Sequence, residues 1–216
     1  MVFRLIVAGS ILLCSSASAS VISSTFGPGY TFDQGVGLTV SDSYDHSVAI
    51  AFTPAFSYLL SGVTVATARQ SVDAPDEVLV GIYANNGGLP GTLLESFDLG
   101  TPTATLTDLP SGSILSALSS THPYLAAGSL YWIVMDSPVA PDSFGDLIWA
   151  TNGSIVPATG LLLAKDSTGA WLPASQTAGT NTGVFELTGN IVPEPGTLLM
   201  LGIGLAGMAG IRKLRA

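Results

Sequence analysis

Short runs of β-branched and aromatic residues, separated by Gly, Pro, Asn and Asp, fill the chain between residues 20 and 190. Such runs predict β-strands. In Tyr58–Ala68 and Glu77–Ala84, apolar side chains alternate between two faces, whereas Leu130–Met135 is apolar on both faces, as a central strand would be. The predicted strands are Gly37–Val40, Ser47–Thr53, Tyr58–Ala68, Glu77–Ala84, Leu93–Leu99, Ala104–Leu109, Leu130–Met135, Gly145–Ala150, Leu161–Lys165 and Thr182–Thr188.

The spacing of these strands predicts the fold class. Apolar residues show no sustained 3.6-residue period in this part of the chain, and only Ser111–Ser120 suggests a single helical turn. Many short strands separated by turn residues predict an all-β, single-domain antiparallel β-sandwich or jelly-roll-like fold over residues 20–190. Gly189 and Asn190 are the only residues expected to be flexible before the C-terminal segment.

The N-terminus predicts an export signal over residues 1–19. Arg4 provides a positive charge, and Leu5–Cys14 is an apolar run of the length expected for a signal peptide. Ala17 and Ala19 then form a small-residue cleavage site before Ser20. Cys14 is the only cysteine, so the mature chain is expected to contain neither a disulfide nor a cysteine metal site.

The C-terminus predicts a short membrane helix. Residues 196–211 carry no charge, and as a helix they would span about 24 Å. That length is marginal for a hydrocarbon core of about 30 Å. Arg212, Lys213 and Arg215 lie in the basic tail 212–216, which would hold the C-terminus in the cytoplasm. Because the N-terminus carries an export signal, the domain between the two ends is expected to lie outside.

The order of a Pro-Glu-Pro motif, an apolar helix and a basic tail over residues 191–216 resembles the PEP-CTERM sorting signal of Gram-negative bacteria. The resemblance implies that an exosortase-type membrane protease recognises the motif and removes the helix. The protein would be anchored transiently in the inner membrane and then reach the outer surface or the extracellular space. A permanent C-terminal anchor is the alternative. The motif residues are Val192, Pro193, Glu194, Pro195 and Gly196.

A second resemblance concerns the stretch Val78–Gly100. The residues Asn85 to Gly88 can adopt positive φ angles, and Leu89-Pro90-Gly91 predicts a second turn. This pattern, with Gly128–Met135, is similar to the choice-of-anchor R domain of exported bacterial proteins. The resemblance spans roughly residues 25–190, and that family implies no biochemical activity.

Charge limits the partners of the domain. Residues 20–193 hold fourteen acidic residues and only Arg69 and Lys165 as basic ones, a net charge of −12. A surface this acidic argues against binding nucleic acid. We expect no cofactor and no metal site. Calcium is the candidate cation for two carboxylate clusters, and solvated loop charge is the alternative. The clusters are Asp33, Asp42 and Asp45, and Asp73, Asp76 and Glu77.

Candidate catalytic residues are few. A catalytic triad of Ser43, Asp45 and His46 is not expected, because side chains so close in sequence seldom point toward a common atom. No Gly-x-Ser-x-Gly motif is present. His122 precedes Pro123 and is expected in a loop. The sequence therefore predicts no enzymatic activity.

Tryptophans provide candidate sugar contacts. Trp132 lies in an apolar run and is expected in the core, whereas Trp171, between turn residues, and Trp149, near a strand end, are candidates for stacking on a sugar. Packing in the protein interior is the alternative for these two residues.

These patterns together predict an exported cell-envelope or matrix protein with a structural or adhesive role in exopolysaccharide or biofilm. A carbohydrate-binding module is the first alternative, and an enzyme that acts on polysaccharide is the second.

Overall fold

The computed structural model describes residues 19–32, 37–41, 47–69, 77–105, 113–136, 146–152, 162–165, 168–173 and 182–193. Within these ranges the chain forms strands and no helix, and neighbouring strands pair antiparallel. The prediction of an all-β antiparallel fold is therefore confirmed. The predicted signal peptide before Ala19, the membrane helix and the basic tail lie outside the described residues. A helix long and apolar enough to span a membrane is not found in the described part of the chain.

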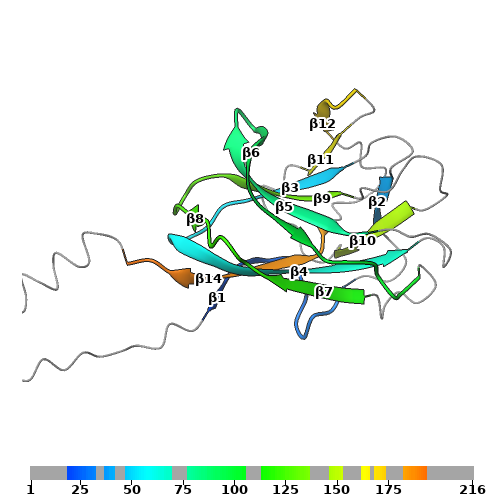
Figure 1. Ribbon diagram of the computed structural model, residues 1–216, viewed down its shortest axis with the longest axis horizontal. Helices are drawn as coiled ribbons and strands as arrows, with labels where there is room; N and C mark the ends of the chain where they lie inside the picture. Colours follow the sequence, from blue (N-terminus) through cyan, green and yellow to red (C-terminus); the bar gives the residue numbers. More distant parts are fainter. Residues whose placement is uncertain are drawn as a thin grey trace, which may run out of the picture.

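The strands form two sheets (Figure 1). The eight-stranded sheet has the order β1-β14-β4-β10-β13, with β2 paired to β10 and with β7 and β8 paired to β4. The six-stranded sheet has the order β12-β11-β3-β9-β5-β6. The strands are β1 (Ser20–Ser24), β2 (Gly37–Ser41), β3 (Val48–Phe52), β4 (Tyr58–Arg69), β5 (Leu79–Asn86), β6 (Leu89–Asp98), β7 (Ser113–Leu118), β8 (Tyr124–Leu125), β9 (Tyr131–Asp136), β10 (Asp146–Asn152), β11 (Leu162–Lys165), β12 (Trp171–Pro173), β13 (Thr182–Gly183) and β14 (Phe185–Ile191).

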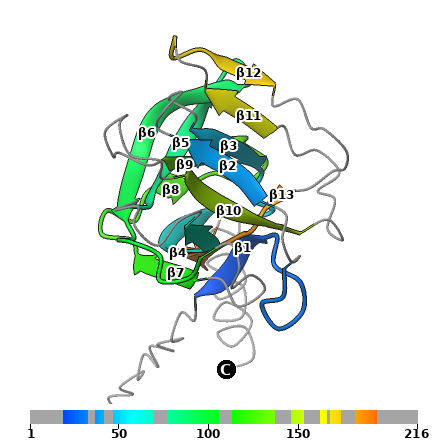
Figure 2. The same ribbon diagram turned by 90° about the vertical axis from the view of Figure 1, so that its right-hand side faces the viewer.

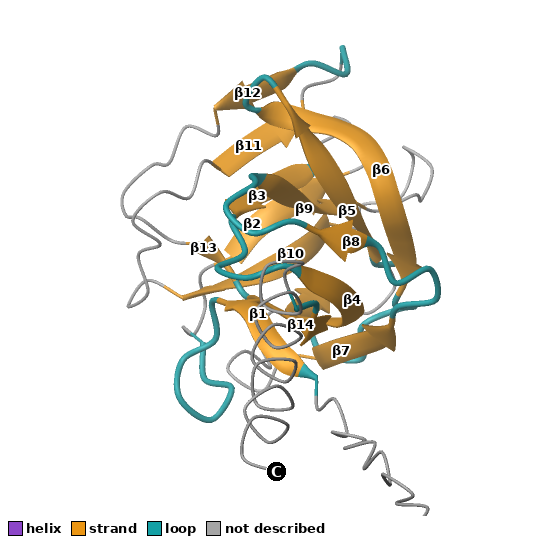
Figure 3. Cartoon of the chain, turned by 90° about the vertical axis from the view of Figure 1, so that its left-hand side faces the viewer, coloured by secondary structure: helices purple, strands orange, loops and turns teal. Residues whose placement is uncertain are grey.

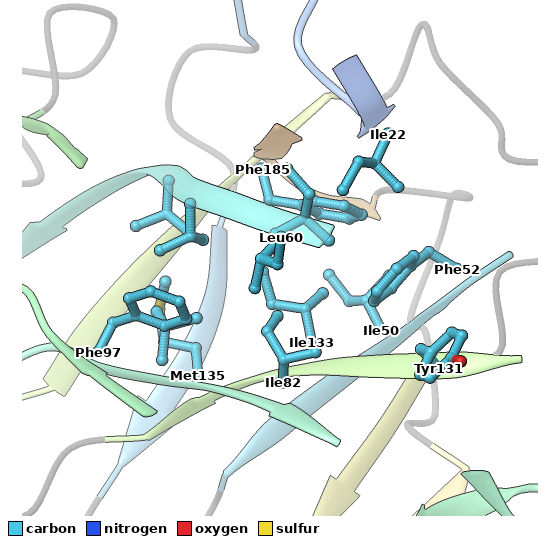
Figure 4. Packing of buried hydrophobic residues seen from close by; sticks show 14 of the residues in the cluster. Ile22, Ile50, Phe52, Leu60, Ile82, Phe97, Tyr131, Ile133, Met135 and Phe185 are labelled. Carbon is cyan, nitrogen blue, oxygen red and sulfur yellow. The ribbon is translucent and has the colours of Figure 1, made fainter. Parts of the chain in front are cut away.

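The main core lies between the two sheets, which face each other in Figure 2. Each sheet contributes one face of its strands, because successive side chains of a strand point to opposite sides. Figure 4 shows side chains of β3, β5 and β9 directed toward those of β4 and β14. The labelled residues are Ile22, Ile50, Phe52, Leu60, Ile82, Phe97, Tyr131, Ile133, Met135 and Phe185.

Strand β4 has twelve residues and contains a bulge that keeps its apolar residues in the core. Its register with β14 shifts between Gly62 and Leu60, so Ser61 is an extra residue in the strand. A bulge of this kind changes the face on which the following residues lie. As a result Leu60, Val63 and Val65 all belong to the core. The prediction that Val63 and Val65 share a face is confirmed.

The alternation predicted for Glu77–Ala84 is also confirmed, since Val78, Val80 and Ile82 are buried in the core between the sheets. The central position predicted for Leu130–Met135 is confirmed by β9, which pairs with β3 on one side and β5 on the other. In β9 every residue from Tyr131 to Met135 is buried.

Two predictions of local structure are wrong. The stretch predicted as a helical turn forms strand β7, because Ser113–Leu118 pairs with β4 along six residues. The second turn predicted at Leu89-Pro90-Gly91 is absent, since these residues start strand β6 and pair back to β5. The hairpin turns at Gly87 and Gly88 alone, whose φ angles of 62° and 90° favour glycine.

Several strands were not predicted or fall partly outside the described residues. β1, β8 and β12 had no strong sequence signal, because each is short and polar or lies next to turn residues. Most of the strand predicted at Ala104–Leu109 lies outside the described residues, although Thr105 forms an isolated bridge with Arg69.

The outer faces of the sheets differ. On the six-stranded sheet, Ala49, Ala51, Trp132 and Val134 form a second buried cluster, against which the half-buried Trp171 packs. On the eight-stranded sheet, part of the outer face is covered by Phe26 and Phe32, which follow β1. Among the described residues, the outer face of β7 is exposed at Ile114, Ser116 and Leu118, and the neighbouring Thr64 of β4 and Thr188 of β14 are half-buried.

Candidate functional site

The C-terminal motif begins where the last strand ends. β14 pairs with β4 as far as Ile191, opposite Tyr58. The N–H of Val192 then donates to the carbonyl oxygen of Ser57 at 2.8 Å. Pro193 has no N–H to continue the ladder and is exposed. The folded domain therefore holds the motif at Val192 and leaves Pro193 exposed. Glu194, Pro195 and Gly196 lie outside the described residues.

This arrangement corrects the expected flexible connection. Gly189 and Asn190 lie inside β14, paired with Leu60 and Leu59. The Asn190 side chain also donates to Ser61 Oγ at 3.2 Å. A Cβ at Gly189 would lie 2.7 Å from Ile22 Cδ1, so the glycine allows β1 and β14 to approach closely.

The start of the domain lies beside its end. β1 begins at Ser20, whose N-terminal neighbour Ala19 is exposed. Ser20 pairs with Gly189, and its Oγ donates to the Gly189 carbonyl at 3.2 Å. β1 and β14 therefore bring the two ends of the domain to the same end of the eight-stranded sheet, on the left of Figure 1 and together in Figure 3. Ala17 lies outside the described residues.

Trp149 lies in the protein interior and not at the surface. It is fully buried between the sheets, and its Nε1 donates to the Val184 carbonyl at 2.9 Å. A Cβ at Gly183 would lie 2.6 Å from the Trp149 ring, so glycine is required for this packing. A ring enclosed in this way cannot stack on a ligand, which corrects the prediction for Trp149.

Trp171 has a different environment. It lies on β12, where it pairs with Lys165 of β11. Its half-buried ring packs on the outer cluster of the six-stranded sheet, to which Tyr83 also contributes. Trp132 lies in that cluster, fully buried as predicted, and its Nε1 donates to Asn85 Oδ1 at 3.1 Å. Of the two candidate tryptophans, only Trp171 remains accessible.

Glu95 is a feature that the sequence analysis missed. It lies on β6, is 6% exposed, and is the buried carboxylate of the described residues. It accepts hydrogen bonds from Ser119 Oγ at 2.5 Å, from the Ser120 N–H at 2.6 Å and hydroxyl at 3.1 Å, and from the Thr121 N–H at 3.0 Å. This single side chain connects the last strand of the six-stranded sheet to the segment after β7.

The same contacts set the charge of Glu95. Burial raises its pKa, but the hydrogen bonds from Ser119, Thr121 and Ser120 together outweigh burial, and the pKa lies below its usual value. The carboxylate is therefore ionised at neutral pH, and its oxygens are occupied by donors. Such a group stabilises the segment after β7 against β6.

Of the two histidines, His122 lies within the described residues. His122 lies in the loop before Pro123, as predicted, with a φ of 48°. Its Nδ1 lies 2.9 Å from the Leu60 carbonyl oxygen, which fixes the ring against β4. His46 and most of the candidate calcium carboxylates lie outside the described residues, with Glu77 the exception. Among described residues, no group of three metal-ligating side chains comes together.

The comparisons with known proteins concern the C-terminus. Residues 192–215 match the PEP-CTERM protein-sorting motif. Curated proteins yield no match to the chain. The matched segment starts at Val192, the residue with which the folded domain ends. The motif indicates an exported protein that undergoes a membrane-associated sorting step with exosortase-type processing.

Proposed function

We propose that the protein is an extracellular or cell-envelope structural component, with an adhesive role in exopolysaccharide or biofilm. In this proposal the β domain is a sandwich related to the choice-of-anchor R family. A signal peptide over residues 1–19 exports it, and the helix 196–211 anchors it transiently in the inner membrane until an exosortase-type protease removes the tail. The proposal depends most on one observation, the sorting motif at 192–215 attached directly to the last strand.

The geometry of the two ends supports this route. Ser20 pairs with Gly189, so the two ends of the domain lie at one end of the eight-stranded sheet. If the membrane held both ends of the chain, this end of the sheet would face the membrane. Val192 is hydrogen-bonded to Ser57, and Pro193 follows, exposed. Proline keeps the chain extended and unpaired, which suits recognition by a protease.

The intact mass of the protein, recovered from membrane and medium of its native host, tests the proposal. We expect an N-terminus near Ser20 and a C-terminus within Val192–Gly196, with any added mass identifying an attached group. A Glu194→Gln variant is expected to keep its tail and remain with the membrane. Glu77→Gln, which changes an exposed glutamate far from the motif in the sequence, is the matched control. A wild-type protein that retains Ala216 in both fractions would contradict the proposal and favour a permanent anchor.

Carbohydrate binding is a second candidate function, favoured by the position of Trp171. Its accessible ring lies on the outer face of the six-stranded sheet, beside a cluster that includes Tyr83. Aromatic rings of this kind provide flat apolar surfaces for stacking. The acidic domain, with its net charge of −12, would favour neutral polymers over anionic ones.

Binding to the exopolysaccharide of the native host tests this second function. We expect Trp171→Ala to abolish saturable binding. Tyr124→Ala is the control, because Tyr124 is an exposed aromatic residue of the other sheet. Equal binding by both variants would exclude the Trp171 face, and absence of binding by the wild type would leave the structural role alone.

A further inference from the structure

Among the described residues, strand β7 forms an edge of the eight-stranded sheet. Its sequence, Ser-Ile-Leu-Ser-Ala-Leu, contains no charge and no proline. Among the described strands it pairs with β4 alone, and it lies at the margin of the molecule in Figures 1, 2 and 3. Ile114 and Leu118 are 47% and 86% exposed. An uncharged edge of this length readily pairs with another strand.

Three other edge strands, β6, β12 and β1, carry features that hinder such pairing. β6 contains Pro90 and two register shifts, and the segment 119–121 covers it at Glu95. β12 has three residues and ends at Pro173. β1 is shifted in register between Val21 and Ser23. Short strands, proline and bulges are common means of blocking edges. β7 has six residues, no proline and no register shift, and so differs from these three strands.

The outward backbone groups of β7 can be assigned. The Ser119 N–H donates to the Ser61 carbonyl oxygen at 2.8 Å. In an antiparallel pair, residues alternate between hydrogen-bonded and non-hydrogen-bonded positions. Leu115 and Ala117 therefore use their N–H and C=O groups toward β4, while those of Ile114, Ser116 and Leu118 point away from it.

We propose that β7 pairs antiparallel with β7 of a second copy of this chain, around a two-fold axis at Ser116. In this register Ser116 lies opposite Ser116 of the second copy, and Ile114 lies opposite its Leu118. The backbone groups of Ile114, Ser116 and Leu118 that point away from β4 can then all form hydrogen bonds with the second copy. The two exposed apolar side chains of one strand meet those of the other on the outer face of the joined sheet.

The lack of charge on β7 and its shape support a second copy as the occupant. The domain carries a net charge of −12, so two copies repel each other on average. The uncharged β7 edge is a place where they can approach. A two-fold contact requires a surface complementary to itself, which the Ile114–Leu118 pairing provides. Beside this edge, Leu118, Gly62 and Thr188 line a shallow hollow of about 150 Å³ that leaves room for the partner's side chains.

Sedimentation equilibrium of the full chain in a nonionic detergent tests the proposal. We expect a reversible monomer–dimer equilibrium, with Leu118→Lys weakening the dimer about tenfold or more, because it places a charge on each edge. Ser116→Pro removes an outward N–H, together with the exposed hydroxyl that lies near Thr64 Oγ1, and is expected to have a similar effect. Leu59→Lys is the matched control, because Leu59 is an exposed leucine of β4 that lies opposite β8.

Cysteine cross-linking tests the register independently of detergent. In a Cys14→Ala background, Ser116→Cys is expected to form an intermolecular disulfide, since hydrogen-bonded antiparallel pairs place Cα atoms about 5.5 Å apart, within disulfide reach. Ser96→Cys, at an exposed position of β6, is the control. A dimer unaffected by Leu118→Lys and Ser116→Pro, a chain that stays monomeric, or equal cross-linking at positions 96 and 116 would overturn the proposal.

Discussion

The two sheets use their strands in different ways. In the six-stranded sheet, β3 and β9 bury every side chain from Val48 to Phe52 and from Tyr131 to Met135, because their inner face meets the core and their outer face is covered. In the eight-stranded sheet, β7 exposes every second residue. The centre of the six-stranded sheet is therefore covered on both faces, whereas the eight-stranded sheet has buried strands such as β10 but exposes side chains at β7. We therefore expect substitutions in the centre of the six-stranded sheet to reduce stability most, and substitutions on the exposed face of the eight-stranded sheet to reduce it least.

The largest effect is expected for Trp132→Ala, in the centre of the six-stranded sheet. The ring is fully buried and its Nε1 donates to Asn85, which also accepts a bond from the Gly88 N–H in the hairpin turn. We expect the free energy of unfolding to fall by about 3–5 kcal/mol, the range for large aromatic deletions. Urea denaturation measures it, with Trp132→Phe as the milder control. A loss below about 1 kcal/mol would show that the outer cluster is not tightly packed.

Glu95→Gln should have the next largest effect, since it acts on the connection between the two sheets. The neutral amide cannot accept the bonds from Ser119, Ser120 and Thr121 as the carboxylate does. We expect a loss of about 2 kcal/mol in the free energy of unfolding, typical of hydrogen bonds to a charged group. Asp98→Asn, on the same strand but exposed, is the control. Equal stability of the two variants would contradict this role for Glu95.

The pH dependence should reveal the same group. The pKa of Glu95 is lower in the folded protein than its usual value, and an unfolded glutamate titrates near about 4.3. The stabilisation is therefore complete above about pH 4.3 and is lost as the pH falls through the folded pKa. The difference in stability between wild type and Glu95→Gln should stay constant from pH 7 down to about pH 4.3 and shrink below it. A difference that does not change with pH would contradict the assignment.

Trp171→Ala should have a smaller effect on stability, about 1 kcal/mol, because the ring is only half-buried at the border of the outer cluster. Thermal unfolding measures it. A loss as large as that of Trp132→Ala would show that Trp171 is a core residue and would weaken its candidacy as a sugar contact.

The smallest effect is expected for Thr64→Ala on the open face of the eight-stranded sheet. Thr64 Oγ1 lies 2.9 Å from Ser116 Oγ, in an exposed hydrogen bond that water can replace. We expect a change within about 0.5 kcal/mol in urea denaturation of the monomer. A larger loss would mean that this face is less open than the exposure of Ser116 indicates.

Residues with strong local signals were predictable. Val63 and Val65, and the fully apolar β9, were assigned correctly because alternation and apolarity report directly on which faces are buried. β7 was misassigned as a helical turn because Ser, Leu and Ala have weak preferences for strands. Its conformation is imposed by pairing with β4, a contact between residues about fifty positions apart, such as Thr64 and Ser116.

The site residues likewise divide into those with a local sequence signal and those that depend on distant contacts. The sorting motif was recognisable because its order of residue types is local and specific, and residues 192–215 match it. The burial of Trp149 was not predictable, since it depends on Gly183, more than thirty residues later, allowing the ring to fit. Glu95 gave no signal, because its partners come from a distant loop.

The position of β14 has a consequence for the timing of folding during export. The last strand of the domain lies inside the eight-stranded sheet, between β1, the first strand, and β4. Contacts between such distant parts of a chain form late. The sheet therefore cannot close until Ile191 has crossed the membrane, and the sorting motif follows immediately. Closure of the sheet can thus directly precede the arrival of the motif. The domain can therefore first be completely folded at the moment when the chain reaches the sorting step.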